Sequence, residues 1–295
     1  MELIVPVMTK FDSEGNMIVD DDYRNFIRAL VKSGVDVVMP CGTNGEFHVM
    51  GLEERKALVR FLVEEFGEYV DVMPHVGSAG YRQVRDLIDH SASLGIKRVS
   101  VVVPYYFKYD SRAIEEFFVP LAKEFEEMEF VMYNIPSFSG NSLSLESIIR
   151  IKERANNVVG LKDTASRPWI VSKIKESLGE DFKVYGGNDS MVLDYLARGA
   201  DGHVSGTANV FPKLLRALLD SFESGDLSRS VEYQKILDRV FENITGSPAF
   251  VAANKYVLKL RGYDLGFPGR PNRDLDDEEK DRIEAVFKSV EDWAI

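Results

Sequence analysis

The chain has 295 residues with 36 basic and 48 acidic side chains, which gives a formal net charge of −12 at pH 7. This acidic balance argues against nucleic acid and anionic membranes as partners, because both attract a basic surface. Cys41 is the only cysteine, so the chain cannot form an internal disulfide, and we expect a reducing, cytoplasmic location. The first residues show no basic segment followed by a long apolar one, so we expect no signal peptide, and no window is apolar enough to span a membrane.

Short apolar runs recur along most of the chain, and a longer amphipathic segment follows each of them. The runs are rich in valine and apolar on both faces, which is typical of strands buried in a parallel sheet. In chain order they cover residues 3–8, 35–39, 70–76, 99–103, 130–133, 158–161, 182–185 and, more weakly, 202–205. Eight strands that alternate with helices predict an α/β protein with a (β/α)8 TIM barrel. A doubly wound open sheet would use fewer strands and usually a glycine fingerprint, and the chain has no G-x-G-x-x-G or G-x-x-x-x-G-K-[ST] motif.

Several of the intervening segments carry signals for the start and the end of a helix. Apolar residues recur at four-residue intervals from Leu58 to Phe66, and Gly67 follows as the expected end of that helix. Ser144 is placed to cap a helix that runs to about Arg154. These segments therefore predict amphipathic helices between the strands.

The alternation stops after Asn209. From about residue 211 to the end, the sequence indicates several helices without a strand between them, and one of these begins near the acidic run 276–279. An acidic run suits the start of a helix, where the dipole favours negative charge, better than a calcium-binding loop. We therefore expect a barrel with the active site over residues 1–225, and a helical C-terminal extension packed on the barrel over residues 226–295.

The sixth apolar run ends in the residues most suggestive of chemistry, Gly160-Leu161-Lys162-Asp163-Thr164. Catalytic groups of a TIM barrel lie at the C-terminal ends of its strands. A lysine that ends a strand apolar on both faces should point into the barrel mouth, where burial disfavours its charged form and makes the amine a nucleophile. Such a lysine can form a Schiff base with a ketone. The alternative is a lysine paired with a neighbouring carboxylate such as Asp163.

Other expected strand ends also supply polar side chains, and each has a simpler interpretation. The turn at residues 41–46 could hold a carboxylate with its backbone N–H groups, or could be an ordinary tight turn. The tyrosines of 104–106 could line a pocket or an interface, or could simply pack. The tyrosine that opens 133–136 could carry a proton, or could be a buried phenol bonded to the backbone. Residues 186–189 and 205–209 are small, polar and glycine-rich, like the rim of a pocket for a hydroxylated substrate or like tight turns.

The sequence offers little support for a metal site. The four histidines are His48, His75, His90 and His203, no two of them have the helical zinc spacing, and there is no cysteine cluster. His75 and His203 follow strands that are far apart in the sequence, so a barrel could bring them together. Packed or hydrogen-bonded histidines are the simpler interpretation, and we expect no metal ion.

Five segments at or beside the expected strand ends follow one another in the order of a known enzyme family. They read G-T-N-G-E at 42–46, P-Y-Y at 104–106, Y-N-I-P at 133–136, G-L-K-D at 160–163 and G-A-D-G at 199–202. These segments resemble motifs of the dihydrodipicolinate synthase/N-acetylneuraminate lyase family. The resemblance implies a (β/α)8 barrel with a helical C-terminal extension, usually a homotetramer, whose substrates are a 2-keto acid and an aldehyde. It also implies that pyruvate is handled through a lysine Schiff base, with no separate cofactor.

The same resemblance assigns roles to individual residues. Lys162 would form the covalent imine, and Tyr133 would shuttle protons. Thr43 would link Tyr133 to Tyr106, which a neighbouring subunit would lend. The main chain around Thr43 and Asn44 would hold the carboxylate of pyruvate. The remaining substrate contacts are expected at Ile135, Asp163, Thr164, Gly187, Asp189 and Ser205.

Two positions depart from the family's pattern. Asn44 stands where the family usually has a second threonine, and its amide can still donate to a carboxylate. Phe138 stands where dihydrodipicolinate synthases carry an arginine for the carboxylate of their second substrate, and a phenylalanine cannot form that bidentate bond. Phe138 therefore argues against a role in lysine biosynthesis.

The C-terminal part resembles one particular branch of the family. Residues 262–268 and 275–279, together with the K-D-T run at 162–164, resemble archaeal 2-keto-3-deoxygluconate aldolases. The resemblance implies a class I aldolase of the Entner–Doudoroff type that reversibly cleaves 2-keto-3-deoxygluconate to pyruvate and glyceraldehyde. Tyr109 and Asn243 stand where relatives that also accept the 6-phosphate place arginines, so the unphosphorylated form is the expected substrate.

Other functions remain open from the sequence. The chain could be another pyruvate-dependent lyase or dehydratase of the same family that acts on a different sugar acid, with dihydrodipicolinate synthase disfavoured by Phe138. It could also be a metal-dependent aldolase, or a non-catalytic barrel that binds a sugar acid, because a shared fold does not guarantee chemistry. A binding protein, however, has no need of Lys162 together with Tyr133.

Overall fold

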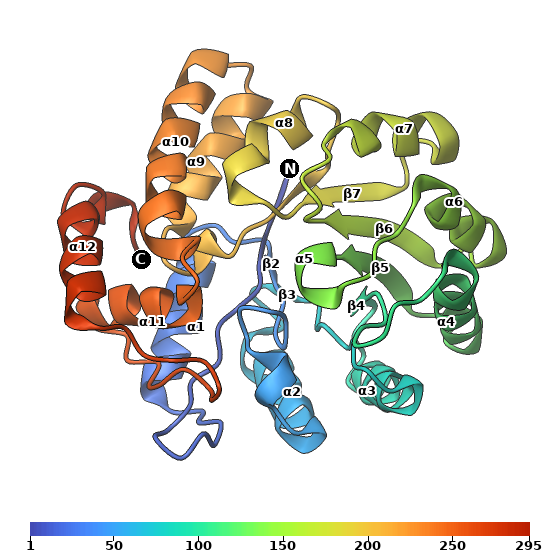
Figure 1. Cartoon of the computed structure of the whole chain (residues 1–295), viewed down its shortest axis with the longest axis horizontal. Coiled ribbons are helices and arrows are strands. Elements are labelled where there is room, and N and C mark those ends of the chain that lie inside the picture. Colours follow the sequence, from blue (N-terminus) through green and yellow to red (C-terminus); the bar gives the residue numbers. More distant parts are fainter.

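The computed structural model describes the whole chain, residues 1–295. Its eight parallel strands form one sheet in the order β3-β2-β1-β8-β7-β6-β5-β4. The two ends of this order meet just past β3, where Val76 N donates to Ser100 O and Ser100 N donates to Pro74 O, each at 2.9 Å. The sheet therefore closes into a (β/α)8 barrel, as the alternating pattern of the sequence predicted (Figure 1).

The strands themselves are short. Their bounds are β1 Glu2–Val5, β2 Val37–Val38, β3 Asp71–Val72, β4 Arg98–Val102, β5 Glu129–Asn134, β6 Val158–Asp163, β7 Lys183–Gly186 and β8 Gly202–Val204. The runs predicted at 3–8, 35–39 and 70–76 are longer than these strands, because their outer residues stay buried after strand pairing ends. Val7, Met39 and Met73, which lie beyond the ends of β1, β2 and β3, are at most 1% exposed. Burial, and not only pairing, therefore explains the extra apolar residues.

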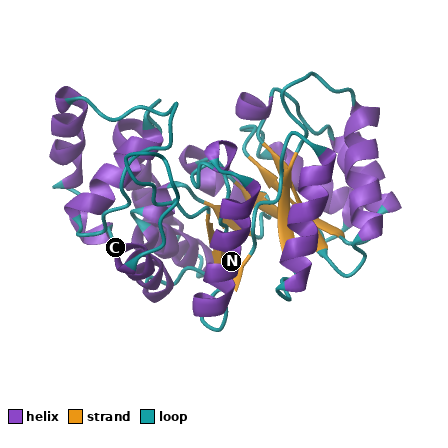
Figure 2. Ribbon diagram, turned by 90° about the horizontal axis from the view of Figure 1, so that it is seen from below, coloured by secondary structure: helices purple, strands orange, loops and turns teal.

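Helices surround the barrel, and Figure 2 shows the strands in the middle of the molecule with helices outside them. The helices are α1 Asp21–Lys32, α2 Leu52–Phe66, α3 Tyr81–Ser93, α4 Ser111–Glu124, α5 Pro136–Ser139, α6 Leu145–Arg154, α7 Trp169–Leu178, α8 Val192–Leu196, α9 Pro212–Glu223, α10 Leu227–Val240, α11 Phe250–Leu260 and α12 Asp277–Phe287. Short helical turns are η1 Phe47–Val49, η2 Asp189–Met191, η3 Thr207–Asn209, the π-helical η4 Phe241–Thr245 and η5 Glu291–Trp293. None of these helices combines the length and the apolar character needed to cross a membrane.

Three predicted helix boundaries are confirmed. Gly67 is the C-terminal cap of α2. The side chain of Ser144 accepts from Ser147 N at 3.1 Å and so begins α6. At the start of α12, the Asp276 carboxylate accepts from Glu279 N at 2.8 Å while the Glu279 carboxylate accepts from Asp276 N at 3.0 Å. This reciprocal capping box confirms that the acidic run opens a helix.

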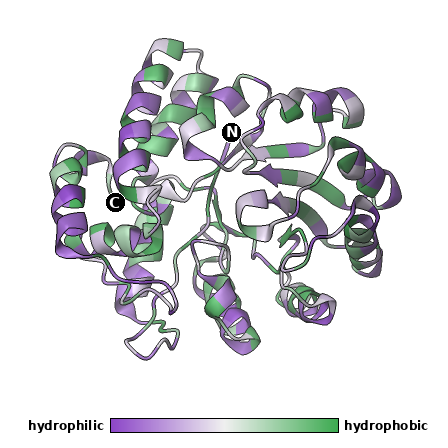
Figure 3. Cartoon of the chain, viewed as in Figure 1, coloured by the Kyte–Doolittle hydropathy of each residue, from purple (hydrophilic) through white to green (hydrophobic).

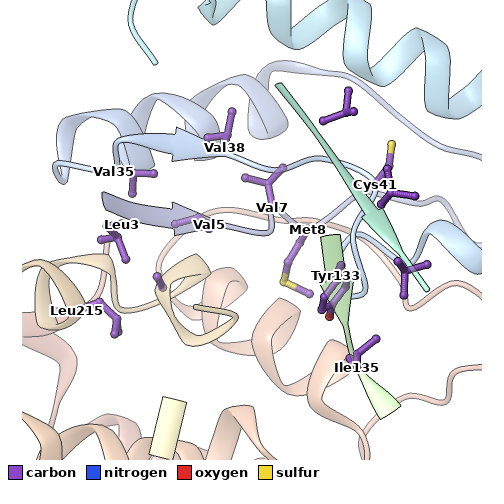
Figure 4. Close-up of a cluster of buried hydrophobic side chains, with 14 of the residues drawn as sticks. Leu3, Val5, Val7, Met8, Val35, Val38, Cys41, Tyr133, Ile135 and Leu215 are labelled. Atoms are coloured by element: carbon purple, nitrogen blue, oxygen red, sulfur yellow. The ribbon is translucent and has the colours of Figure 1, made fainter. Parts of the chain in front are cut away.

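Apolar side chains pack in two places. Inside the barrel, seven buried residues form a small core: Ile4, Val37, Met39, Met73, Val131, Tyr185 and Val204. A much larger core lies between the strands and the surrounding helices, and Figure 4 shows part of it, including Leu3 of β1 and Leu215 of α9. The helices accordingly carry both hydrophobic and hydrophilic residues along their length (Figure 3). This packing holds the strand ends in place and gives side chains there defined positions.

No strand follows residue 209, as predicted, and α10, α11 and α12 lie along one side of the barrel (Figure 1). The last residues return to the barrel, because Ile295 N donates to Val210 O at 3.1 Å and Lys213 Nζ donates to Ala294 O at 2.8 Å. We propose that the boundary between the barrel and the extension falls at residues 224–226, between α9 and α10, and that both parts fold as one unit.

Candidate active site

The carboxyl ends of the strands surround a cavity of about 460 Å³. Most of the predicted site residues line it: Thr43, Asn44, Tyr133, Ile135, Lys162, Thr164, Gly187 and Asp189. They come from segments around β2, β5, β6 and β7 that are far apart in the sequence. The barrel brings them together because all its parallel strands end at the same face.

Lys162 lies near the end of β6, in register with Tyr133 of β5. It is only 4% exposed, and its Nζ lies 3.9 Å from the centre of the Tyr133 ring. Burial lowers the pKa of Lys162 to about 7, and the nearby Asp189 carboxylate opposes this shift. A large share of the amine is therefore uncharged near neutral pH, as a nucleophile requires.

Asp163 does not form the ion pair with Lys162 that the sequence left open. Its fully buried carboxylate instead accepts from Asn134 Nδ2 at 2.7 Å and Tyr195 OH at 2.8 Å, and it pairs with Arg167 at 3.0 Å. Consecutive residues of a strand point to opposite faces, so Lys162 faces the barrel interior while Asp163 faces the helices. The structure therefore does not place Asp163 in the cavity wall, where a substrate contact was expected.

Tyr133 and Thr43 lie in contact, as the resemblance implied. The Tyr133 hydroxyl is 3.2 Å from Thr43 Oγ1. Burial raises the pKa of Tyr133 to about 12, and the hydrogen bond with Thr43 partly opposes that rise. The phenol therefore keeps its proton at neutral pH and can both donate and accept a hydrogen bond.

The turn after β2 leaves two backbone donors free. The N–H groups of Thr43 and Asn44 have no acceptor within the chain. Gly45 is packed so closely that a Cβ would lie 2.9 Å from Val7 O, and Glu46 follows in the left-handed region with a φ of 57°. This tight course keeps both N–H groups available to an anion such as a carboxylate.

The side chains of Asp189 and Ser205 form hydrogen bonds to other residues of the protein. Asp189 Oδ1 lies 2.9 Å from His203 Nε2, and its Oδ2 accepts from Thr207 N at 3.0 Å. Burial alone would raise the pKa of Asp189, but these contacts hold it below its usual value, so the residue lines the cavity as a carboxylate. Ser205 is fully buried, its Oγ accepts from Ala208 N at 3.1 Å, and it does not line the cavity where a contact was expected.

Tyr106 lies outside the cavity of its own chain. It is 85% exposed, its φ is 86°, and its ring packs edge-on against Phe107. Apart from Phe107, nothing within the subunit covers this large aromatic side chain, and contacts within one subunit do not explain its unusual backbone conformation. We keep the prediction that Tyr106 reaches the site of a neighbouring subunit.

The C-terminal extension supplies part of the cavity wall, which the expected strand ends did not indicate. The additional lining residues include Phe241, Thr245, Gly246, Ser247, Pro248 and Phe250. Ser247 Oγ is buried without a hydrogen-bond partner, so it is available to a substrate hydroxyl. The only sequence signal for this wall is the short G-S-P run between α10 and α11.

His75 and His203 have different partners. No group of three or more His, Cys, Asp or Glu side chains is arranged to hold a metal ion. His203 bonds to Asp189, whereas His75 packs edge-on against Phe47 with ring centres 4.8 Å apart. Burial and the neighbouring Arg55 guanidinium lower the pKa of His75, so its ring is neutral.

A (β/α)8 barrel with a buried amine beside a buried phenol at its carboxyl face is suited to Schiff-base chemistry. A sequence profile of the dihydrodipicolinate synthetase family matches residues 1–290, and the chain belongs to this family. It is therefore a lyase. The enzymes of the family act on pyruvate through a lysine Schiff base and take no external cofactor.

The chain is similar to proteins that are named for different activities. A DapA-like lyase of Halobacterium salinarum is 34% identical over 284 residues, which are 96% of this chain and 91% of that protein. An N-acetylneuraminate lyase of Lactiplantibacillus plantarum is 26% identical over 269 residues, covering 90% and 89%. The solved structure of YagE, a prophage protein from E. coli K12 in complex with pyruvate, has a TM-score of 0.92 and 26% identity and covers 98% of both chains. These relatives share a family of lyases and differ in the activities that their names give.

Proposed function

We propose that the chain is a class I aldolase that reversibly cleaves 2-keto-3-deoxygluconate to pyruvate and glyceraldehyde. The observation that carries this proposal is the contact between Lys162 and Tyr133, in which an amine with a pKa of about 7 lies 3.9 Å from the ring of a buried phenol. An uncharged amine attacks a ketone and a nearby phenol moves protons, which are the two requirements of imine chemistry.

In the cleavage direction, Lys162 attacks the C2 ketone of the sugar acid, and loss of water gives an iminium that acts as an electron sink. Tyr133 takes the proton of the C4 hydroxyl while its own proton passes to Thr43, whose hydroxyl lies 3.2 Å away and releases its own proton toward solvent. The C3–C4 bond breaks, glyceraldehyde leaves, and the electrons of that bond form the enamine of pyruvate. Protonation at C3 and hydrolysis of the imine then release pyruvate and restore the amine.

The remaining lining residues support a hydroxylated sugar acid as substrate. The free N–H groups of Thr43 and Asn44 suit its carboxylate. Asp189 and Ser247 offer an acceptor and a hydroxyl to the sugar. Phe138 lines the same cavity and offers no charge to a second carboxylate, which supports the aldolase over dihydrodipicolinate synthase.

A pyruvate lyase for another sugar acid is the second candidate, and the relative named N-acetylneuraminate lyase favours it. Both candidates use the same imine and differ only in the aldehyde released. Cleavage rates for a panel of 2-keto sugar acids under one condition distinguish them. We expect 2-keto-3-deoxygluconate to give the highest kcat/KM, and a higher value for N-acetylneuraminate would favour the second candidate.

Reductive trapping tests the chemistry itself. Incubation with pyruvate and borohydride should add the mass of one reduced pyruvate imine, and peptide mapping should locate it at Lys162 and at no other lysine. Lys162→Ala is the matched control and should take up no label. A label on another lysine, or no label under conditions where the protein is active, would contradict the mechanism. Loss of activity with a chelator would indicate a metal-dependent aldolase instead.

A further inference from the structure

A buried ion pair lies directly behind the turn that carries the free N–H groups. Glu46, the last residue of this turn, is fully buried, and its Oε1 lies 2.9 Å from Nζ of Lys255 in α11. Lys255 is 3% exposed. Each charge would be strongly unfavourable in this position without the other. The pair therefore joins the turn after β2 to a helix of the C-terminal extension.

Further hydrogen bonds hold both members of the pair. Glu46 Oε2 accepts from Gly269 N at 2.7 Å and from Asn272 Nδ2 at 2.8 Å. Lys255 Nζ also donates to Phe267 O at 2.6 Å. The segment 267–272 thus closes over the pair, and every polar contact of the Glu46 side chain is made to the extension. Charged groups bonded in this way have little freedom to move.

The pair connects two walls of the cavity. Thr43 and Asn44 precede Glu46 within the same tight turn and line the cavity from the barrel. On the other side, Phe250 at the start of α11 lines it from the extension, between one and two helical turns before Lys255. A displacement of either charged residue would therefore shift a wall of the cavity, although neither side chain lines it.

We propose that Glu46 and Lys255 are positioning residues whose ion pair makes the C-terminal extension part of the pyruvate-binding site. The pair holds the N–H groups of Thr43 and Asn44 where the carboxylate of pyruvate binds. This inference rests on the proposed function, because it requires that this turn binds pyruvate. Loss of the pair should weaken pyruvate binding and leave the chemistry at Lys162 intact once pyruvate is bound.

The test measures the rate of borohydride trapping against pyruvate concentration, which yields a half-saturating concentration and a maximal rate. The main variant is Glu46→Gln/Lys255→Met, because it removes both buried charges together. We expect its half-saturating concentration to rise about 10- to 100-fold, the range for a misplaced binding group, with a nearly unchanged maximal rate. Glu46→Gln alone keeps an oxygen for the Gly269 N–H and should shift in the same direction.

Lys259→Met is the matched control. Lys259 lies one turn further along α11 and forms an exposed ion pair with Asp264 at 3.1 Å. It should trap pyruvate like the wild type, and an equal shift in this variant would contradict a specific role for Lys255. Circular dichroism and thermal melting establish that each variant is folded. If the role of the pair were purely structural, its loss would lower Tm without changing the half-saturating concentration of pyruvate.

Two negative outcomes are distinguishable. Folded Glu46→Gln or double-variant protein with the half-saturating concentration of the wild type would overturn the positioning role. Wild-type protein that takes up no label at Lys162 would overturn the proposed function instead.

Discussion

Lys162 illustrates at the scale of one residue how a buried nucleophile opposes folding. Its pKa is about 7 in the folded chain, against an ordinary value of 10.5. A folded-state pKa below the unfolded one means that protonation favours the unfolded chain. The penalty is fully present below pH 7 and declines as the pH rises toward 10.5, where the amine is neutral in both states.

Lys162→Met should therefore stabilise the protein, and more so in acid. The gain at pH 6 should exceed the gain at pH 9 by roughly 2–3 kcal/mol. Between these pH values the penalty falls by the equivalent of about two pKa units, and each unit is worth about 1.4 kcal/mol. Guanidinium unfolding at both pH values gives the free energies. Lys173→Met, which changes an exposed lysine of α7, is the control and should show no such pH dependence. An equal gain at both pH values would show that the pKa of Lys162 is not lowered.

A substitution at Tyr133 distinguishes substrate binding from proton transfer. Tyr133→Phe keeps the ring beside Lys162 and removes the hydroxyl that contacts Thr43. Imine trapping should persist, while turnover should fall by about 10²-fold or more, the usual contribution of a positioned acid–base group. Tyr185→Phe is the control, because this buried phenol bonds Glu2 outside the cavity. Near-normal turnover of Tyr133→Phe would mean that another group carries the proton.

At the scale of elements, the loop between β4 and α4 is tied to the loop after α5. Asn141 Nδ2 donates to Phe107 O at 2.7 Å, and Tyr109 N donates to Asn141 Oδ1 at 3.0 Å. Lys108 Nζ donates to the carbonyl of Gly140. Lys108 is the only cation of this loop, and its ammonium group is bound to a backbone carbonyl. The loop therefore presents no free cation to the cavity.

Tyr109 in this loop and Asn243 in η4 predict discrimination against a phosphorylated substrate. Tyr109 and Asn243 stand where the resemblance implies arginines in relatives that also accept the 6-phosphate, and neither can offer a phosphate a forked permanent charge. The absence of two charge-assisted contacts of ~1.5–3 kcal/mol each should disfavour 2-keto-3-deoxy-6-phosphogluconate by about 10²- to 10⁴-fold. The measurement is kcat/KM for both forms in one buffer at one salt concentration. Equal or better cleavage of the phosphate would contradict this prediction, and Lys108→Ala would then show whether that lysine supplies the charge.

At the scale of the whole molecule, the exposed Tyr106 predicts an assembly. We propose a homotetramer built as a dimer of dimers, because the resemblance implies one and because Tyr106 has no site in its own subunit. Tyr106→Phe should lower activity at an unchanged Tm, while Tyr69→Phe, another highly exposed tyrosine, should leave activity unchanged. Sedimentation at the assay concentration gives the oligomeric state. A fully active monomer would contradict the shared site.

Much of the barrel and the central pair of residues could be predicted from the sequence. Strands that are apolar on both faces recur often enough to define a (β/α)8 barrel, and such a barrel brings every strand end to one face. Lys162 and Tyr133 therefore had to lie at the same edge. Each lies one residue before the end of its strand, so the barrel brings the two together whatever their separation along the chain.

Only the tertiary structure decided which neighbouring residues face the cavity. A strand that is apolar on both faces does not reveal which residues face inward, so Asp163 was expected in the site together with Lys162, and only the pleat of the folded strand turns Asp163 toward the helices. The same holds for Ser247 and for the pair of Glu46 and Lys255. Those contacts join the barrel to a helical extension distant in the sequence, and amphipathic periodicity describes how each helix buries one face without specifying which residue it meets there.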